Sequence, residues 1–343
     1  MRRIAPLVLV ILLAGCASTR EPSFGEASAD APVRLHVIPV LEQEELAVQV
    51  IVANSAGATA QYGAIGGLLG AIIDSSINNS RARKAERKAE VLREASADLP
   101  LLDSFAAATD LPSEGVGWRI VSVADISGRA SRTDAVSRAF ADDGLDEVVV
   151  LAGRYEMVPE LDQFALRVDQ TFYERSPSKR SGFEVRARRS FTYLSPMHPV
   201  VERAFRPGER EALAATLREE YEQALEASGA DEDALRKALA EELEDLEEAD
   251  SVPESVAIAE AWTSERLTRY FGQAERHIAR MIAFDWNERS FPELSNPELD
   301  RYMITNALGT RTSQRGRRIE ALDDNVIYRA RDTSLHSVPA EDS

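Results

Sequence analysis

Cysteine and histidine are nearly missing from this chain of 343 residues, which contains one cysteine and four histidines. A single cysteine cannot form a disulfide within the chain, so stability must come from a buried core. No two histidines stand at the spacing of a zinc site, and no H-E-x-x-H sequence occurs. We therefore expect no cofactor and no bound metal.

Nucleophile and phosphate-binding motifs are equally scarce. The chain has no G-x-S-x-G elbow, no Walker sequence and no G-x-G-x-x-G. One S-x-x-K sequence, Ser176 to Lys179, lacks the companion motifs of the serine enzymes that use it and falls in an expected hairpin loop. These absences favour a protein that is not an enzyme, although a site assembled from distant residues would leave no local motif.

Basic residues are in the minority, with 40 Lys and Arg against 58 Asp and Glu and a net charge of −18. Nucleic acid binding needs clustered Lys and Arg on the phosphates, so we expect no nucleic acid partner. The acid excess is concentrated in residues 231–250, which hold ten acidic and two basic side chains. We interpret that run as a solvated helix face or a charged linker.

The chain also lacks an apolar run long enough to cross a bilayer at its N-terminus. Arg2 and Arg3 precede ten apolar residues, Ile4 to Leu13, in the layout of an export signal. A membrane-spanning helix needs roughly 20 such residues, so this run is too short to be the final anchor.

The apolar run ends in Leu13-Ala14-Gly15-Cys16, which resembles the lipobox of bacterial lipoproteins. The resemblance covers only the first sixteen residues. It implies cleavage before Cys16, a diacylglyceryl thioether on Cys16 and a fatty acyl group on its new amine. Because Ala17 stands where Asp would favour the inner membrane, it further implies a lipid anchor on the periplasmic face of the outer membrane. The alternative is an ordinary secretory signal with an incidental cysteine, but such signals end in an A-x-A pattern.

The rest of the chain predicts an α+β fold: a mixed or antiparallel sheet domain with packed helices, then a helical extension and a small C-terminal β meander. The expected parts are a signal peptide at 1–15, a lipidated tether at 16–32, an α+β domain at 33–200, a helical region at 201–310 and a small β tail at 311–343.

Strands are predicted where Val, Ile and aromatic residues cluster or alternate with polar ones. These segments are 33–40, 46–53, 118–124, 146–152, 162–174 and 183–193. The first two would form a hairpin, and the last two would be adjacent antiparallel strands with one face buried. Residues 146–152 are apolar on both faces, which is typical of a central strand.

Helical patterns follow. Residues 132–143 predict a short helix, 208–249 two helices broken near Ser228-Gly229, 254–286 one helix with a long apolar stripe, and 297–308 a further short helix. A three-stranded meander is expected over 317–322, 326–331 and 334–338.

The glycine-rich segment 56–73 allows three interpretations. Glycine costs a helix about 1 kcal/mol relative to alanine, so two overlapping G-x-x-x-G pairs require a reason. The segment could be a buried helix packed on the sheet, a homo-oligomer face, or a membrane-inserted segment. The glycines are Gly63, Gly66, Gly67 and Gly70. In the last case the basic residues that follow would contact lipid phosphates, namely Arg81, Arg83, Lys84, Arg87 and Lys88.

These features favour a lipid-anchored envelope protein with a non-catalytic binding, assembly or structural role. Its expected partners are the membrane, through lipid on Cys16, and a protein partner or a second copy. Two alternatives stay open: a periplasmic hydrolase whose site is not visible in sequence, and an oligomeric assembly that enters the membrane through 56–73. A pocket with convergent polar groups would indicate the hydrolase, and an exposed apolar or glycine-rich patch would indicate binding.

Overall fold

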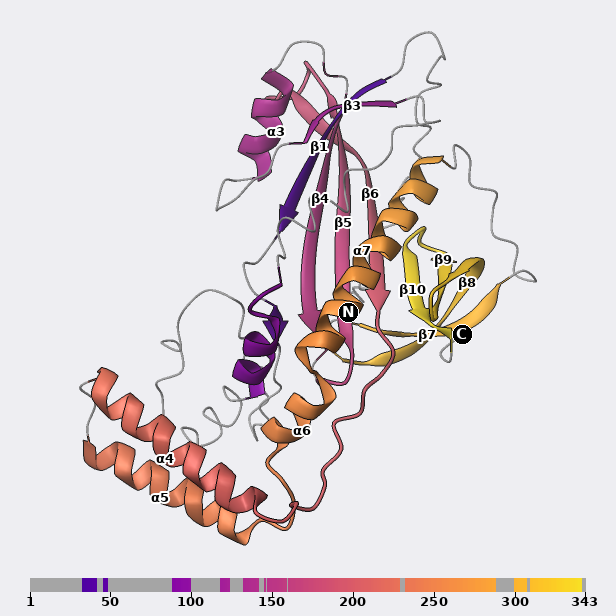
Figure 1. Ribbon diagram of the computed structural model, residues 1–343. Coiled ribbons are helices and arrows are strands. Elements are labelled where there is room, and N and C mark those ends of the chain that lie inside the picture. The colour runs from indigo at the N-terminus through magenta and orange to yellow at the C-terminus, as the bar shows by residue number, and fades with distance from the viewer. Residues whose placement is uncertain are drawn as a thin grey trace, which may run out of the picture.

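The computed structural model describes residues 33–41, 46–48, 88–99, 118–123, 132–141, 145, 147–158, 160–228, 232–287, 299–306 and 309–340. In these residues a large mixed sheet carries helices on both faces, and a pair of helices projects from one end (Figure 1). The predicted α+β fold, with its helical extension and C-terminal meander, is confirmed.

Ten strands form one sheet in the order β3-β1-β4-β5-β6-β10-β9-β8-β7, with β2 paired to β4. Strands β3, β1 and β4 are parallel, β4 to β6 are antiparallel, and β10 returns parallel to β6. Strands β10, β9, β8 and β7 are antiparallel. The bounds are β1 (Val33–Leu41), β2 (Ala47–Val48), β3 (Trp118–Val123), β4 (Glu147–Met157), β5 (Phe164–Arg175), β6 (Phe183–Leu194), β7 (Asp300–Thr305), β8 (Arg311–Leu322), β9 (Asn325–Ala330) and β10 (Leu335–Pro339).

The central strands follow the sequence pattern closely. Strand β4 lies between β1 and β5 and is buried at every position except Arg154, as its two apolar faces predict. Strands β5 and β6 are paired antiparallel, with Phe164, Leu166 and Val168 on the buried face of β5. The predicted central strand and the predicted antiparallel pair are both confirmed.

The hairpin expected from 33–40 and 46–53 is wrong. Strand β1 pairs in parallel with Glu147–Gly153 of β4, and β2 pairs in parallel with Glu156 and Met157 further along the same strand. The two segments therefore lie end to end on one edge of β4. A long buried strand offers more ladder hydrogen bonds than an isolated two-stranded hairpin, which is marginal by itself.

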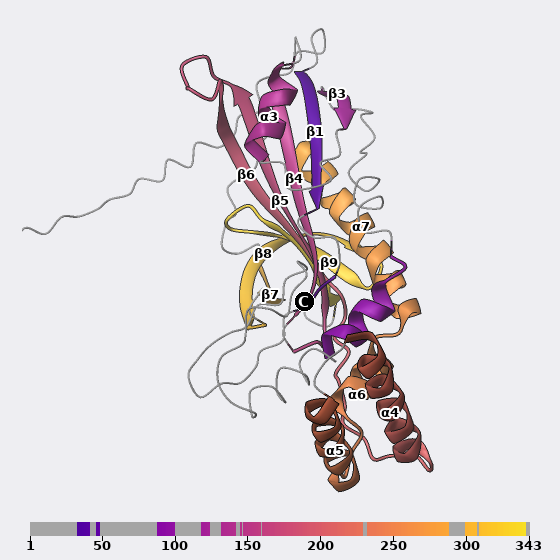
Figure 2. The same ribbon diagram turned by 90° about the vertical axis from the view of Figure 1, so that its left-hand side faces the viewer.

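Helices α3 (Arg132–Ala141) and α7 (Ser264–Asn287) cover opposite faces of the long strands (Figures 1 and 2). Phe140 of α3 stacks on Phe183 in a small apolar cluster with residues of β1 and β4. Helix α7 buries a longer apolar stripe against β4 to β6, and this stripe supplies much of the main core. The stripe predicted for 254–286 is confirmed: Ile258, Trp262, Leu267, Tyr270, Phe271, Ile278, Met281 and Ile282 are all buried.

The single helix expected over 254–286 is divided into α6 (Glu254–Ala261) and α7 by a break at Trp262 and Thr263. The fully buried Trp262 indole Nε1 donates a hydrogen bond of 2.6 Å to the Leu161 carbonyl. Anchoring this side chain in the body fixes the point where the chain changes direction, which the helical periodicity alone does not reveal.

The short helix expected at 297–308 is also wrong, because Asp300–Thr305 forms β7. Tyr302 and Ile304 are buried on one face of β7, and short apolar runs do not distinguish a strand from a helix by period alone. The predicted meander is confirmed in β8, β9 and β10, and β7 adds a fourth strand. The Tyr302 ring stacks on Tyr328 at 4.5 Å, close to Gly316, where a larger side chain would collide with the Arg329 carbonyl.

Helices α4 (Glu209–Ser228) and α5 (Glu232–Glu248) form the predicted pair, broken where the sequence indicates. The two helices pack on each other and project away from the sheet (Figures 1 and 2). Within the described part of the chain, neither helix contributes a residue to the three apolar clusters of the body. We call residues 209–248 the hairpin.

Candidate functional site

Most residues singled out in the sequence lie outside the described residues: Cys16, Gly63, Gly66, Gly67, Gly70, Arg81, Arg83, Lys84 and Arg87. Lys88 is the exception. It begins the described helical residues 88–96, and its ammonium forms an ion pair with the Glu254 carboxylate of α6. Among the helices that the structure describes, none has the length and apolar character needed to cross a bilayer.

Where α7 meets the sheet, a serine contacts a histidine, and the histidine contacts an aspartate. The Ser337 hydroxyl lies 2.8 Å from Nδ1 of His277, and Nε2 of His277 lies 3.3 Å from the Asp323 carboxylate. A neutral histidine that donates from Nε2 to Asp323 would accept the serine proton at Nδ1. This is the order of a catalytic triad with the two ring nitrogens exchanged.

This arrangement is closed to a substrate. Ser337 and His277 are both fully buried, and the serine hydroxyl also receives a hydrogen bond of 3.0 Å from the Asn325 amide. Burial lowers the pKa of His277, while the neighbouring Asp323 carboxylate opposes that shift. A neutral, fully bonded histidine fixes the β8–β9 turn and β10 to α7, which is a structural role.

A second buried polar group lies near the end of α7. The Asp285 carboxylate is fully buried; it receives a hydrogen bond of 3.3 Å from the Gln170 amide and lies 3.5 Å from Nε of Arg189. Trp286 Nε1 in turn donates to the Gln170 carbonyl at 2.8 Å. Burial raises the pKa of Asp285, and the charges of Arg189 and Arg329 oppose the rise. Because the carboxylate has no solvent access, it positions α7 and has no route to a substrate.

A third group of hydrogen-bonded polar side chains crosses the C-terminal strands. The Ser334 hydroxyl donates to Asp332 at 2.5 Å and lies 3.0 Å from Nε2 of His336, while Nδ1 of His336 lies 2.8 Å from the Tyr302 hydroxyl. Burial lowers the pKa of His336 to about 4, so its imidazole is neutral at pH 7. These hydrogen bonds connect β7 to β10 beside the small apolar cluster that contains Tyr302.

No local motif in the sequence marks these groupings. His277 and Ser337 are 60 residues apart, and each stands among ordinary helical or strand residues. Treating every histidine as structural is consistent with what the structure shows for His277 and His336. In the described part of the chain, no three His, Cys, Asp or Glu side chains are grouped as a metal site would require.

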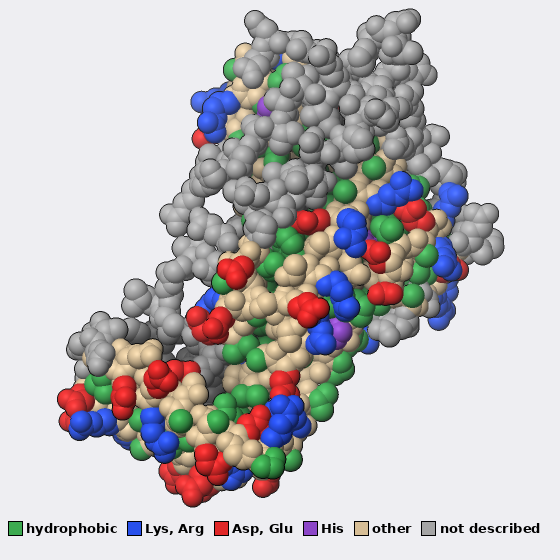
Figure 3. Space-filling model, viewed as in Figure 1, with side chains coloured by type: hydrophobic (Ala, Val, Ile, Leu, Met, Phe, Trp, Pro, Cys, Tyr) green, Lys and Arg blue, Asp and Glu red, His purple; other side chains and the backbone are tan. Residues whose placement is uncertain are grey.

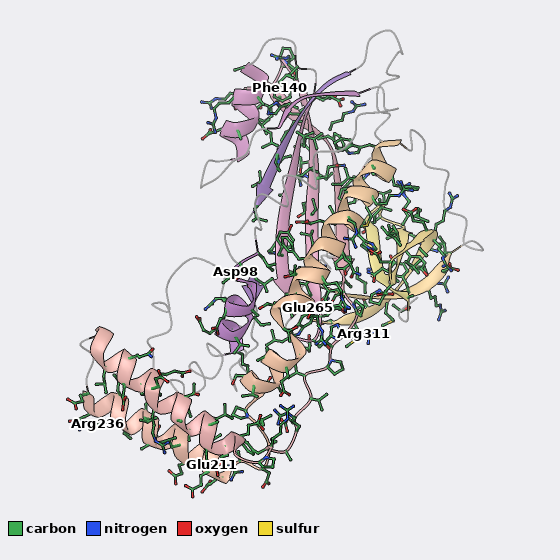
Figure 4. All side chains as sticks on the ribbon, viewed as in Figure 1. Asp98, Phe140, Glu211, Arg236, Glu265 and Arg311 are labelled. Carbon is green, nitrogen blue, oxygen red and sulfur yellow. The ribbon has the colours of Figure 1, made fainter. Side chains whose placement is uncertain are left out.

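A prominent accessible feature of the described residues is the hairpin. Its two helices carry fourteen acidic and four basic side chains, a net charge of −10 in 37 residues of a chain whose total is −18. Acidic side chains line its lower edge in Figure 3, and Figure 4 shows Glu211 and Arg236 on the hairpin, away from the sheet. Six leucines between the helices are only partly buried: Leu213, Leu217, Leu225, Leu235, Leu239 and Leu243.

The base of the hairpin is fixed by charge. The Arg203 guanidinium donates two hydrogen bonds to Glu209, of 2.7 and 2.6 Å, and two more to Glu260 of α6, of 2.9 and 2.5 Å. Hydrogen bonds from Arg203 and from the Arg206 backbone lower the pKa of Glu209 to about 2. Just beside them, Ala204 and Ser251 form an antiparallel bridge. The chain thus enters and leaves the hairpin at one closed neck.

No protein family model, curated protein or solved structure matches this chain. Its function is therefore inferred from its own residues, and the hairpin is the accessible candidate.

Proposed function

We propose that this protein is a lipid-anchored, non-catalytic envelope protein that holds an acidic helical hairpin in the periplasm to bind a protein partner. The anchor follows from the lipobox-like sequence that ends in Cys16. Lipid on this cysteine would replace a transmembrane helix, and its several acyl chains exceed the two signals that stable anchoring needs.

One observation carries the binding role: the first described strand begins at the end of the molecule far from the hairpin. Strand β1 begins at the end far from α4 and α5 in both views (Figures 1 and 2). Sixteen residues, 17–32, separate Cys16 from β1, and a chain of that length spans about 20–24 Å by the scaling for linkers. A body held this close to the lipid surface by the start of β1 would direct the hairpin away from it.

The chemistry of the hairpin indicates the kind of partner. Fourteen acidic side chains favour a basic protein surface and disfavour anionic lipid or nucleic acid. The half-buried leucines between α4 and α5 add apolar contact area that two helices cannot cover alone. Buried serine, histidine and aspartate groups, by contrast, give the hydrolase alternative little support in the described residues.

The anchor is tested by metabolic labelling with a fatty acid, comparing the wild-type chain with Cys16→Ala. We expect label and membrane association in the wild type only. The proposal fails if the alanine variant is labelled equally, or if the wild type washes off membranes in plain buffer.

The binding role is tested by removing the hairpin at its neck. Residues 206–249 are replaced by a short Gly-Ser linker, which the Ala204–Ser251 bridge makes geometrically easy. We expect in-cell cross-linking to join the wild type, but not this variant, to a protein partner, while both chains stay at the membrane. Unchanged cross-links would contradict the proposal. The matched control is Thr216→Ala, an exposed change on α4 that leaves charge and neck intact.

A further inference from the structure

A second charged surface lies away from the hairpin, where β7 and β8 expose arginines (Figures 1 and 2). Arg301 of β7 lies directly opposite Arg315 of β8, and Arg317 follows two residues further on the same face. All three side chains are exposed. We call Arg301, Arg315 and Arg317 the arginine face; Lys and Arg side chains gather along this edge of the molecule in Figure 3.

The arginine face carries unneutralised charge. In the part of the chain that the structure describes, no carboxylate lies within the 4.0 Å ion-pair distance of Arg301, Arg315 or Arg317. Like charges directly opposite each other destabilise a sheet. Nearby Arg280 of α7, by contrast, is paired with Glu320 of β8 at 2.6 Å. The arginine face is therefore locally unfavourable and suited to an anionic ligand.

A complementary surface exists at the end of α5. Glu244, Glu247 and Glu248 are exposed at spacings of three and four residues, which places them on one side of the helix. The last turn of α5 has no basic residue of its own, and Arg210 of α4 donates to the backbone carbonyls of Glu247 and Ala249 there. No cation of the described chain lies within ion-pair distance of these three side chains. We call them the glutamate face.

We infer that the arginine face binds the glutamate face of a second copy of this chain. The spacings match: opposite residues of paired strands lie about 4.5–5.5 Å apart and alternate residues of one strand about 7 Å apart, while helix neighbours at three or four residues lie about 5–6 Å apart. In the contact, the positive charges of one face neutralise the negative charges of the other and reduce the repulsion within each face. The inference rests on the proposed binding role of the hairpin and names its partner surface.

The contact is head to tail. In Figures 1 and 2 the hairpin and β7–β8 belong to different parts of the molecule, so the two faces of one chain do not meet. Each copy would offer an arginine face to one neighbour and a glutamate face to another. Such heterologous contacts build rings or filaments, here arrayed on a surface by the lipid anchors.

Salt dependence follows from the same charges. The net charge of −18 repels a second copy at long range, but at physiological salt the screening length is about 8 Å, so contacting pairs prevail. At 1 M salt, with a screening length of about 3 Å, the contact weakens as well.

The test uses the mature chain with Cys16→Ser, which lacks only the signal and the lipid, in sedimentation at 0.15 M salt. The arginine-reversed variant carries Arg301→Glu, Arg315→Glu and Arg317→Glu; the glutamate-reversed variant carries Glu244→Arg, Glu247→Arg and Glu248→Arg. We expect the wild type to associate and each variant alone to associate at least about tenfold more weakly, because attraction becomes repulsion. An equal mixture of the two variants should associate again, since each reversed face then meets its opposite.

Three outcomes overturn the inference: a wild type that stays monomeric up to the highest soluble concentration, variants that associate as the wild type does, or a mixture that stays monomeric. The control is Arg318→Glu, the same charge reversal at a single exposed residue one position along β8, on the other face by register, and it is compared with Arg317→Glu alone. This control should associate normally. Circular dichroism shows that all chains are folded.

A vesicle-binding experiment tests whether the arginine face binds lipid phosphate instead of a second copy. The wild type would then bind phosphatidylglycerol vesicles and not self-associate, and the arginine-reversed variant would lose vesicle binding. That result would assign the arginine face to lipid phosphate and overturn the inference of a second copy. If self-association is absent but hairpin deletion still removes a partner in cells, the inference fails and the proposed function stands. If the hairpin captures nothing and the mixture stays monomeric, both fail.

Discussion

Two regions of this molecule contain the same kinds of polar and charged side chains but place them in different environments. Where α7 meets the sheet, the buried Ser337 and His277 contact each other, and His277 also contacts Asp323 at the exposed β8–β9 turn. In the hairpin, acidic side chains remain exposed, and most of its leucines are only partly covered. Groups that resemble a catalytic centre therefore stabilise the body, while the hairpin leaves its charged side chains accessible for recognition.

The comparison predicts that core truncation is far more damaging in the body than in the hairpin. Trp262→Ala removes a fully buried ring and its hydrogen bond to Leu161, and we expect a loss of about 3–5 kcal/mol in the free energy of unfolding. Leu239→Ala in the half-buried hairpin layer should lose about 1 kcal/mol or less. Urea unfolding followed by tryptophan fluorescence and circular dichroism measures both; equal losses would erase the distinction.

Acid should weaken the body through its buried histidines. Burial lowers the pKa of His336 to about 4 from 6.5, so below pH 6.5 the unfolded chain binds more protons than the folded one. Stability is therefore complete above about pH 6.5 and declines as the pH falls toward 4, by on the order of 3 kcal/mol. His277 and His198, whose pKa values burial also lowers, act in the same direction.

The histidine contribution is isolated by comparing the wild type with His336→Gln at pH 7.5, 5.5 and 4.5. The difference in unfolding free energy between the two proteins should shrink or reverse as the pH falls. A difference that is constant with pH would show that His336 does not titrate between the folded and unfolded states.

Removing the hydroxyl of Ser337 should affect stability by a smaller amount. Ser337→Ala leaves a buried histidine nitrogen and the Asn325 amide without this partner, and we expect a loss of about 1–3 kcal/mol. Thermal unfolding measures it. Ser181→Ala, in the exposed β5–β6 loop, is the control and should change stability little. A neutral effect of Ser337→Ala would contradict the structural role of the series.

Arg203→Met should have the smallest effect on global stability and the largest on the hairpin neck. The ion pairs of Arg203 with Glu209 and Glu260 lie at the surface, where solvent screens the attraction and such pairs contribute little to stability. Losing them should speed hydrogen exchange at the ends of α4 and α6 and leave the sheet protected. Unchanged exchange at the neck would mean that the backbone bridge alone fixes the hairpin.

Sequence reasoning succeeded where a segment's own pattern decides its structure. The two apolar faces of β4, the alternation in β5 and β6, and the Ser228-Gly229 break between α4 and α5 are all local signals. It failed where tertiary partners decide: β2 continues along β4, Trp262 breaks a periodic helix, and 300–305 becomes a strand because β8 pairs with it.

The candidate surfaces likewise combine features that could be predicted from sequence with features that depend on the folded structure. The acidic excess of 231–250 was readable as an exposed helix face, and alternate arginines at 315 and 317 were an available signal. That Arg301 lies beside Arg315 is a fact of strand register, which no window of sequence contains. The buried series around His277 likewise depends on three segments that meet only in the folded chain.

The separation between a self-sufficient body and a projecting recognition element is tested most directly by the unfolding free energy of the chain in which a Gly-Ser linker replaces residues 206–249. Because the hairpin adds nothing to the apolar clusters of the described body, we predict a value within about 1 kcal/mol of the wild type, with an equally cooperative transition. A loss of several kcal/mol, or a body that no longer unfolds cooperatively, would show that the hairpin is part of the folding unit.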